Sequence, residues 1–299
     1  MSILVVGSTG NVGSAVTEQL AQRNANVRAL IHTRKHKFSD SANFSANVET
    51  VEADVMDMNS MRRALKNVDT LFLLNPVVAD ELSRALLCLD LAIEAGVKGV
   101  VYVSMFNADR FLDCPHACAK YATELMMHKV QIPATILRPN YFFQNDGGAV
   151  VENSEYPMPI GPLGVSMVDV RDIAEVAALS LIKRDQSREP LPIEIIEIHG
   201  PDVITSESAI KIWSEVLGKP VRYVGDDLSE AERRFSKVMP SAMAYDVVGM
   251  FRGFHKYGMV GSKASIDRLT ALLGRRLRTY RDYAEECAKE STATKQSAA

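Results

Sequence analysis

Short apolar runs alternate with amphipathic patterns along the first half of the chain. The first run, Ile3 to Val6, leads through a glycine-rich turn into apolar residues at helical spacing from Val12 to Leu20. Further runs of strand length follow, separated by segments of helical periodicity. Strands that alternate with helices at this rhythm predict a parallel, doubly wound sheet. We expect strands at 3–6, 26–31, 48–53, 70–74, 99–103 and 134–137, and helices near 59–65, 79–95 and 116–129.

The helical patterns also predict helix starts and buried faces. Asn59 or Ser60 is the expected cap of the helix near 59–65, because short polar side chains bond the free N–H groups of a first turn. The helix at 79–95 is expected to bury one apolar face, made of Leu82, Leu86, Leu89 and Ile93.

The alternation loosens after about residue 145. We expect residues 1–150 to form a Rossmann-type NAD(P)-binding domain, with segments at about 165–200 returning to it. Residues 201–289 predict a small substrate or partner lobe, which is helical and rich in Met and Phe from Ser229 onwards. The polar residues 290–299 predict a disordered tail. The predicted fold class is therefore α/β, a doubly wound parallel sheet with a small, mainly helical C-terminal lobe.

The turn after the first run carries three glycines, Gly7, Gly10 and Gly13. Glycines between a strand and a helix allow a tight turn, close approach of a pyrophosphate to the backbone, and close packing of helix on strand. The helix N-terminus then presents N–H groups and a positive dipole end to an anion. An ordinary glycine-rich turn is the alternative. The predicted cofactor contacts of this loop are Gly7, Thr9, Gly10, Asn11, Val12 and Gly13.

Ligands of a doubly wound sheet bind at the carboxyl ends of its strands. The aromatic residues after the strand at 134–137 could stack on a nicotinamide or a flat substrate, or could belong to the core. The predicted cofactor contacts at strand ends are His32, Asp54, Leu74, Asn75, Pro76, Ser104, Pro139, Asn140, Tyr141 and Phe142.

The end of the second strand bears on the choice of cofactor. An NAD site usually has Asp or Glu about 20 residues beyond the glycines, bonded to the ribose 2′-OH. Residues 32–37 read His-Thr-Arg-Lys-His-Lys and contain no carboxylate. We therefore expect NADP(H), with NAD(H) possible, and add Arg34 and Lys35 to the predicted contacts because cations bind a 2′-phosphate. A solvated basic loop is the alternative.

Composition narrows the class of protein. A formal net charge of −3 and a pI near 6.1 give no reason to expect nucleic-acid binding. No apolar run approaches the ~20 residues of a membrane span. The chain starts directly with a strand pattern, so we expect no signal or transit peptide. Its four cysteines fit no disulfide framework, and a reducing, cytoplasmic location is expected.

These features together resemble the NmrA-like family of atypical short-chain dehydrogenase/reductases over nearly the whole chain. The spacing Gly-x-x-Gly-x-x-Gly is typical of that superfamily. The resemblance implies an NADP(H)-binding Rossmann domain with a small C-terminal lobe. It also implies either an NADPH-dependent reductase, quinone reductases included, or a redox sensor without turnover. The matching segments are 7–13, 27–31, 52–57, 68–74, 101–104, 133–140, 168–173 and 217–223.

The resemblance also directs attention to catalytic residues. Typical short-chain dehydrogenases use a serine and a Tyr-x-x-x-Lys pair, in which the tyrosine handles the carbonyl proton. Here the matching stretch is His116-Ala-Cys-Ala-Lys120, so lysine is kept and tyrosine is replaced. The predicted catalytic residues are Lys120, His116 and Ser104. His116 could donate a proton, or could lie at the rim of the site.

Cys114, His116 and Cys118 could suggest a metal site. In a helix, however, residue 116 would point away from 114 and 118, and the sequence offers no obvious fourth ligand nearby. We therefore expect no metal.

Two functions remain open at this point. One is an NADPH-dependent reductase of quinone-like or other flat, electron-poor acceptors, which need less acid catalysis than ketones. The other is a non-catalytic NADP(H)-sensing regulator that acts through a protein partner. The kept lysine favours the enzyme, and the lost tyrosine favours the sensor.

Overall fold

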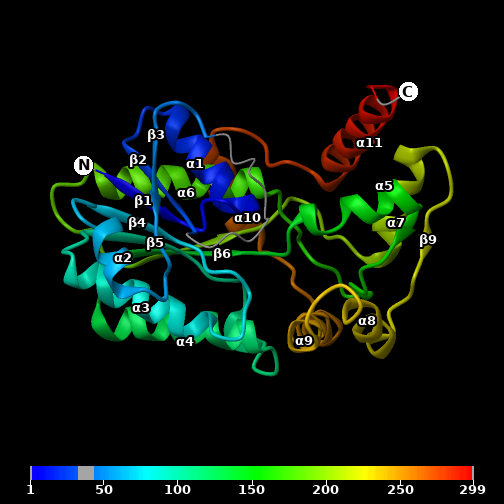
Figure 1. Ribbon diagram of the computed structural model, residues 1–299. Coiled ribbons are helices and arrows are strands. Elements are labelled where there is room, and N and C mark those ends of the chain that lie inside the picture. The colour runs from blue at the N-terminus through cyan, green and yellow to red at the C-terminus, as the bar shows by residue number, and fades with distance from the viewer. Residues whose placement is uncertain (1, 33–43, 298–299) are drawn as a thin grey trace. The chain divides into compact units, whose positions relative to one another are not determined.

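The chain divides into two compact units in the computed structural model, which describes residues 2–32 and 44–297 (Figure 1). Unit 1 comprises Met1–Met105, Ala119–Arg138 and Ile173–Ile196. Unit 2 comprises Phe106–Cys118, Pro139–Asp172 and Glu197–Ala299. Each unit is therefore assembled from three separate stretches of chain.

The main sheet has seven strands in the order β3-β2-β1-β4-β5-β6-β8, and the neighbouring pairs from β3 through β6 are parallel. This order, which reverses between β1 and β4, confirms the predicted Rossmann-type doubly wound sheet. The strands are β1 (Ile3–Val6), β2 (Val27–Ile31), β3 (Val48–Glu52), β4 (Thr70–Leu73), β5 (Gly99–Val103), β6 (Ala134–Pro139) and β8 (Glu194–Ile198).

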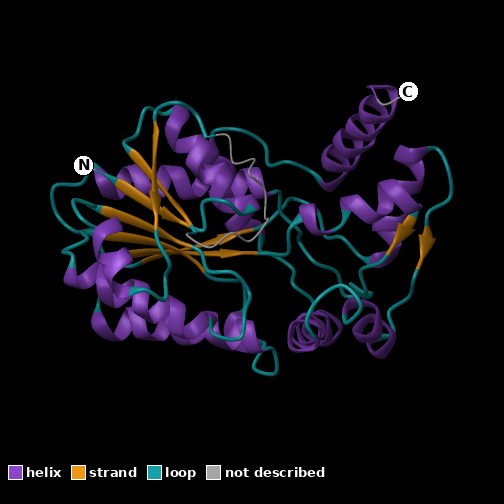
Figure 2. Cartoon of the chain, in the orientation of Figure 1, coloured by secondary structure: helices purple, strands orange, loops and turns teal. Residues whose placement is uncertain are grey.

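Helices cover both faces of this sheet (Figures 1 and 2). One face carries α1 (Asn11–Gln22) and α6 (Val170–Asp185). The other face carries α2 (Met58–Ala64), α3 (Glu81–Glu94) and α4 (Pro115–Val130).

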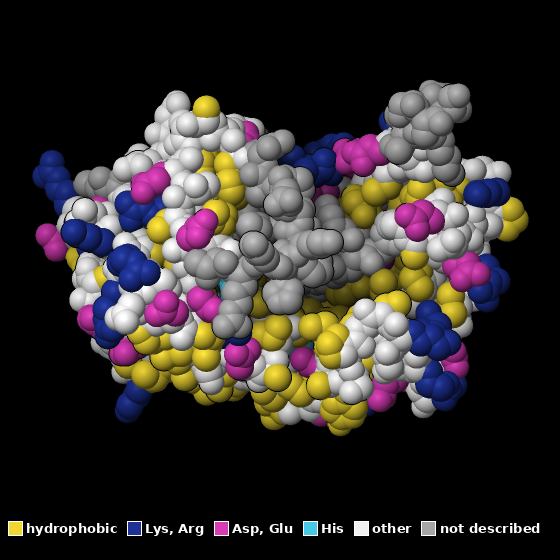
Figure 3. All heavy atoms as spheres, viewed as in Figure 1, with side chains coloured by type: hydrophobic (Ala, Val, Ile, Leu, Met, Phe, Trp, Pro, Cys, Tyr) yellow, Lys and Arg dark blue, Asp and Glu magenta, His cyan; other side chains and the backbone are white. Residues whose placement is uncertain are grey.

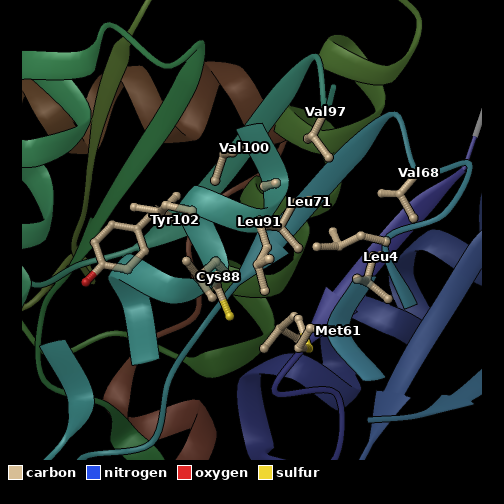
Figure 4. Close-up of a cluster of buried hydrophobic side chains, with 14 of the residues drawn as sticks. Leu4, Met61, Val68, Leu71, Cys88, Leu91, Val97, Val100 and Tyr102 are labelled. Carbon is tan, nitrogen blue, oxygen red and sulfur yellow. The ribbon is translucent and has the colours of Figure 1, made fainter. Parts of the chain in front are cut away.

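A buried apolar cluster joins the strands of unit 1 to α2 and α3 (Figure 4). Each such Leu or Val side chain stabilises the fold by about 1.5–3 kcal/mol relative to exposure. This packing fixes the strand ends at which the candidate site lies. The labelled members are Leu4, Met61, Val68, Leu71, Cys88, Leu91, Val97, Val100 and Tyr102.

The structure corrects two predictions about these helices. The start of α2 is capped by Asp57, whose side chain accepts from the N–H groups of Asn59 and Ser60, the two residues expected as caps. Ile93 is half exposed, although it was predicted to be buried. Of the four residues predicted for the α3 face, Leu89 alone is fully buried; the buried face instead contains Glu81, Ala85, Cys88, Leu91 and Ala92.

Unit 2 is mainly helical. Its helix α11 continues to Ser297, so most of the segment predicted as a disordered tail is helical. Of the segments at about 165–200 that were expected to return to the main domain, Ile173–Ile196 lies in unit 1. The part around Val165 lies in unit 2 and bridges to Ile204 and Met259. The elements are η1 (Ala108–Arg110), η2 (Phe143–Asn145), α5 (Gly147–Asn153), β7 (Glu155–Tyr156), α7 (Ser206–Leu217), β9 (Arg222–Tyr223), α8 (Leu228–Phe235), α9 (Ser241–Tyr257), α10 (Lys263–Leu273) and α11 (Tyr280–Ser297).

A hydrogen-bonded group of buried side chains lies in the core of unit 2. Asp146 Oδ2 accepts from the hydroxyls of Tyr156 at 2.8 Å and Tyr280 at 2.6 Å. Trp213 Nε1 in turn donates to the Tyr280 hydroxyl at 2.9 Å. Burial raises the pKa of the Asp146 carboxyl to about 7 even though the tyrosines oppose this.

Among the described residues, no helix has the length and apolar character needed to cross a bilayer. On the face that Figure 3 shows, Lys and Arg side chains lie dispersed among Asp and Glu rather than in one patch.

Candidate functional site

The glycine loop of unit 1 depends on the absence of side chains at two positions. Gly7 has φ +84°, and a Cβ there would lie 2.5 Å from the carbonyl oxygen of Leu74. A Cβ on Gly13 would lie 2.0 Å from the carbonyl oxygen of Gly7. Both distances are below any real contact, so the loop and α1 pack on β1 and β4 only with glycine here.

The N-terminus of α1 follows this loop directly. Gly10 is its N-cap and supplies no side-chain cap, and the first turn contains no acidic residue. Thr9, Gly10 and Asn11 are exposed, whereas Val12 is buried beneath them. The uncapped N–H groups and the helix dipole suit an anion such as a pyrophosphate.

The ends of β4 and β5 place further predicted residues in unit 1. Asn75 and Ser104 are both buried, while Leu74 is half-buried and Pro76 exposed. The side-chain oxygens Asn75 Oδ1 and Ser104 Oγ have no hydrogen-bond partner among the described residues. A buried polar atom without a partner costs about 1–3 kcal/mol. Two such atoms at adjacent strand ends fit a site whose ligand supplies the missing bonds.

His32 and Asp54 come together at the ends of β2 and β3. His32 Nε2 lies 3.6 Å from Asp54 Oδ2. The end of β2 therefore has a carboxylate beside it, supplied by the next strand rather than by residues 32–37. Arg34 and Lys35, the predicted phosphate contacts, lie outside the described residues.

Lys120 is buried in unit 1 and paired. Its ammonium lies 2.8 Å from Glu81 Oε1 and donates to the Val103 carbonyl oxygen at 3.3 Å. Burial would lower the pKa of Lys120, but the oxygens of Tyr102 and Glu81 more than offset this and raise it. Lys120 is therefore a fixed cation beside the end of β5, where Ser104 follows.

The other predicted contacts belong to unit 2, where most are engaged in packing. The Asn140 amide donates to the Met259 carbonyl at 2.7 Å, and its oxygen accepts from the Tyr141 N–H. The Tyr141 ring is buried against Phe251 and Phe254 of α9. Pro139 is buried and Phe142 is half-buried. Core packing therefore accounts for Tyr141.

His116 lies in a polar cluster of unit 2 together with Cys114 and Asp246. Cys114 Sγ is 3.3 Å from His116 Nδ1, and Asp246 Oδ1 of α9 is 2.8 Å from the same nitrogen. The expectation that residues 114 and 116 point apart is wrong. Because α4 starts at Pro115, Cys114 precedes the helix and does not follow its 100° step.

Two carboxylates that pair with predicted site residues could not be recognised from the sequence. Glu81 is the first residue of α3 and reads as an ordinary acidic first-turn residue. Asp246 lies 130 residues from His116 in a Met-rich helix. Only the fold shows that these carboxylates pair with Lys120 and His116.

The chain resembles proteins of known sequence and structure. The model of the NmrA-like family matches residues 1–285. An NAD(P)H azoreductase from Xenophilus azovorans is 27% identical over 95% of this chain and 96% of its own length. A Citrobacter sp. triphenylmethane reductase has a similar fold, with a TM-score of 0.80, 21% identity, and coverage of 97% of this chain and 100% of its own. An Escherichia coli NADPH-dependent quinone oxidoreductase complexed with NADPH also has a similar fold, with a TM-score of 0.79 and 22% identity. The match covers 96% of this chain and 99% of the oxidoreductase.

Proposed function

Because the chain belongs to the NmrA-like family, we propose that it is an NADPH-dependent reductase of flat, electron-poor acceptors such as quinones and azo compounds. The observation that carries this proposal is the glycine loop with the uncapped start of α1. A nearby pair of unpartnered polar atoms, Asn75 Oδ1 and Ser104 Oγ, supports it. The azoreductase from Xenophilus azovorans, similar over nearly its whole length, supports the reaction class.

NADP(H), when bound, supplies the hydride. The N–H groups at the start of α1 would hold the pyrophosphate, and the Ser104 hydroxyl would bond the nicotinamide amide or the acceptor. An ammonium has three donors, and Glu81 and Val103 engage two of those of Lys120. The third would bond a ribose hydroxyl, so Lys120 would position the cofactor.

The preference for NADP(H) over NAD(H) rests on the basic residues after β2. Arg34 and Lys35 would contact the 2′-phosphate through charge-assisted hydrogen bonds. Use of NAD(H) also stays possible, because Asp54 lies beside His32 and its carboxylate can accept a hydrogen bond from a ribose hydroxyl. Residues 201–289 are proposed to contribute the acceptor or partner specificity.

The acceptor class follows from the missing tyrosine. Reduction of a quinone gives a stabilised anion that can be protonated by water, so positioning of the two reactants supplies much of the rate. Reduction of an azo bond needs a proton donor, and His116 is the proposed donor, held at Nδ1 by Asp246.

A non-catalytic NADP(H)-sensing regulator is the second candidate. The observation that favours it is the replacement of the usual tyrosine by His116, together with the pairing of Lys120 with Glu81. Such a protein would bind the cofactor tightly and leave every acceptor unchanged.

Steady-state NADPH oxidation against a panel of quinones and azo dyes separates the two candidates. The reductase is expected to turn over at least one acceptor class, with NADPH as the better donor. Tight NADPH binding in calorimetry combined with no turnover of any acceptor would reject the enzyme and leave the regulator. Failure to bind either cofactor would reject both.

A further inference from the structure

A second site stands out in unit 2, at the junction of α9 with the start of α4. Cys114, His116 and Asp246 are all buried there. Their ligand-type atoms Sγ, Nδ1 and Oδ1 lie within 4.8 Å of one another. Thiolate, imidazole and carboxylate are the three side-chain groups that bind zinc in proteins. We propose that these three residues form a zinc-binding site.

The distances between the three ligand atoms fit a single zinc ion bound to all of them. Zinc bonds of about 2.0–2.3 Å in tetrahedral geometry place the ligand atoms roughly 3.3–3.8 Å apart. Sγ lies 3.3 Å from Nδ1 and 3.4 Å from Oδ1. Nδ1 and Oδ1 are closer, at 2.8 Å, because a hydrogen bond joins them. An ion between them would replace that bond and widen this one separation by about half an ångström.

The protein backbone around the site is tightly packed. A Cβ on Gly249 of α9 would lie 3.1 Å from the Asp113 carbonyl oxygen, and one on Gly253 would lie 2.1 Å from the Phe111 ring. Two glycines therefore let α9 approach the segment that carries Cys114. Close backbone packing keeps the ligands of the two segments at a fixed separation before any ion binds.

The Asp246 carboxylate is also held by a backbone group that is not itself a zinc ligand. Asp246 Oδ1 accepts from the backbone N–H of His116 at 3.1 Å. Ligating carboxylates in metal sites are commonly oriented by such a bond. On binding, the Cys114 thiol would release its proton to solvent, and the neutral His116 ring would carry its proton on Nε2 so that Nδ1 can bind the ion.

Three protein ligands leave a fourth zinc position for water or an oxygen of a small ligand. The mixed nitrogen, oxygen and sulfur donors favour zinc over magnesium or calcium, which prefer oxygen alone. The ion would also link α9 to the start of α4 within unit 2. Because the ion would take Nδ1 of His116 and Oδ1 of Asp246, the proton-donor role proposed for His116 would belong to the metal-free protein. Zinc binding itself does not depend on whether the protein turns over NADPH.

Zinc content tests this site directly. Protein dialysed against a metal-free buffer and reloaded with Zn²⁺ is expected to retain one ion per chain by mass spectrometry. Loading with Co²⁺ should give a thiolate-to-cobalt charge-transfer band. The variants Cys114→Ser and Asp246→Asn should weaken Zn²⁺ binding at least ~100-fold, and Cys114→Ser should abolish the band.

Cys118→Ser is the matched control, because Cys118 lies on α4 close to His116 but donates to the Leu112 carbonyl oxygen instead. It should bind zinc as the unchanged protein does. NADPH binding and circular dichroism verify that each variant is folded. An unchanged protein that holds no zinc and gives no cobalt band would overturn the site, leaving a hydrogen-bonded cluster. Equal losses in the Cys114 and Cys118 variants would overturn it too.

Discussion

Gly13 determines how closely α1 approaches the phosphate loop. An added Cβ would lie 2.0 Å from the Gly7 carbonyl oxygen, and this neighbour is backbone that cannot rotate away. Overpacking of this kind typically costs about 1–3 kcal/mol. Gly13→Ala should therefore weaken NADPH binding at least about tenfold in a fluorescence titration. Gly148→Ala is the control, since a Cβ there meets open space; equal effects of the two variants would contradict the assignment of the loop.

The Lys120–Glu81 pair gives a second prediction at this scale. Both side chains are almost fully buried, so removing one charge leaves the other without a counterion. Glu81→Gln should lower the free energy of unfolding by about 3–5 kcal/mol, and Glu81→Gln with Lys120→Met should restore part of that loss. Urea unfolding of the unchanged protein, of Glu81→Gln, of Lys120→Met and of the double variant measures the coupling between the two residues.

The exposed pair of Arg62 and Glu94, at 2.8 Å, provides the comparison. Glu94→Gln should change stability very little, because water screens this pair. A Glu81→Gln variant as stable as Glu94→Gln would show that the buried ammonium needs no partner.

At the scale of elements, Asp146 joins β7 to α11 through two tyrosine hydroxyls. Its folded pKa, about 7, lies above the unfolded value near 3.8, so folding favours the protonated acid. The resulting contribution to stability is complete below pH 3.8 and is lost as the pH rises through about 7. The loss approaches about 1.4 kcal/mol per pH unit within this window.

Asp146→Asn carries no ionisable group and can still accept from both tyrosines. As the pH rises from 4 to 7, the unfolding free energy of the unchanged protein should therefore fall relative to that of the variant. Urea unfolding at several pH values measures the shift. Parallel pH profiles of the two proteins would show that the Asp146 carboxyl titrates normally.

The sequence predicted the strands well because buried parallel strands are short, nearly continuous apolar runs, as Thr70 to Leu73 shows. It predicted helix faces less well. A helix packed on a sheet buries small residues where it comes closest, and α3 buries Ala85 and Ala92 while Ile93 stays exposed. The cap of α2 was misplaced by two or three residues, since Asp57, Asn59 and Ser60 are all competent caps.

The residues of the candidate site also differ in how well the sequence predicts them. The glycine loop is local, so its spacing was enough to predict a turn with room for a phosphate. The partners Glu81 and Asp246 are distant in sequence from Lys120 and His116, and no local pattern encodes them. Cys114 was misjudged because helical geometry was extended one residue beyond the helix start at Pro115.

At the scale of the whole molecule, the two units offer a way to locate cofactor binding. The glycine loop, Asn75, Ser104 and Lys120 all belong to unit 1. A ligand that binds only the folded state at 100 times its Kd stabilises it by about 2.7 kcal/mol. NADPH at that level should raise the unfolding free energy accordingly and slow amide hydrogen exchange at the start of α1 and the ends of β4 and β5.

NADH at the same concentration should stabilise less, because it lacks the phosphate that Arg34 and Lys35 are proposed to bind. In an Arg34→Ser/Lys35→Ser variant the two cofactors should become nearly equal, whereas Lys66→Ser, on the exposed turn after α2, should leave the difference intact. Equal protection by NADPH and NADH in the unchanged protein would refute the phosphate contacts. Protection confined to unit 2 would refute the glycine loop as the cofactor site.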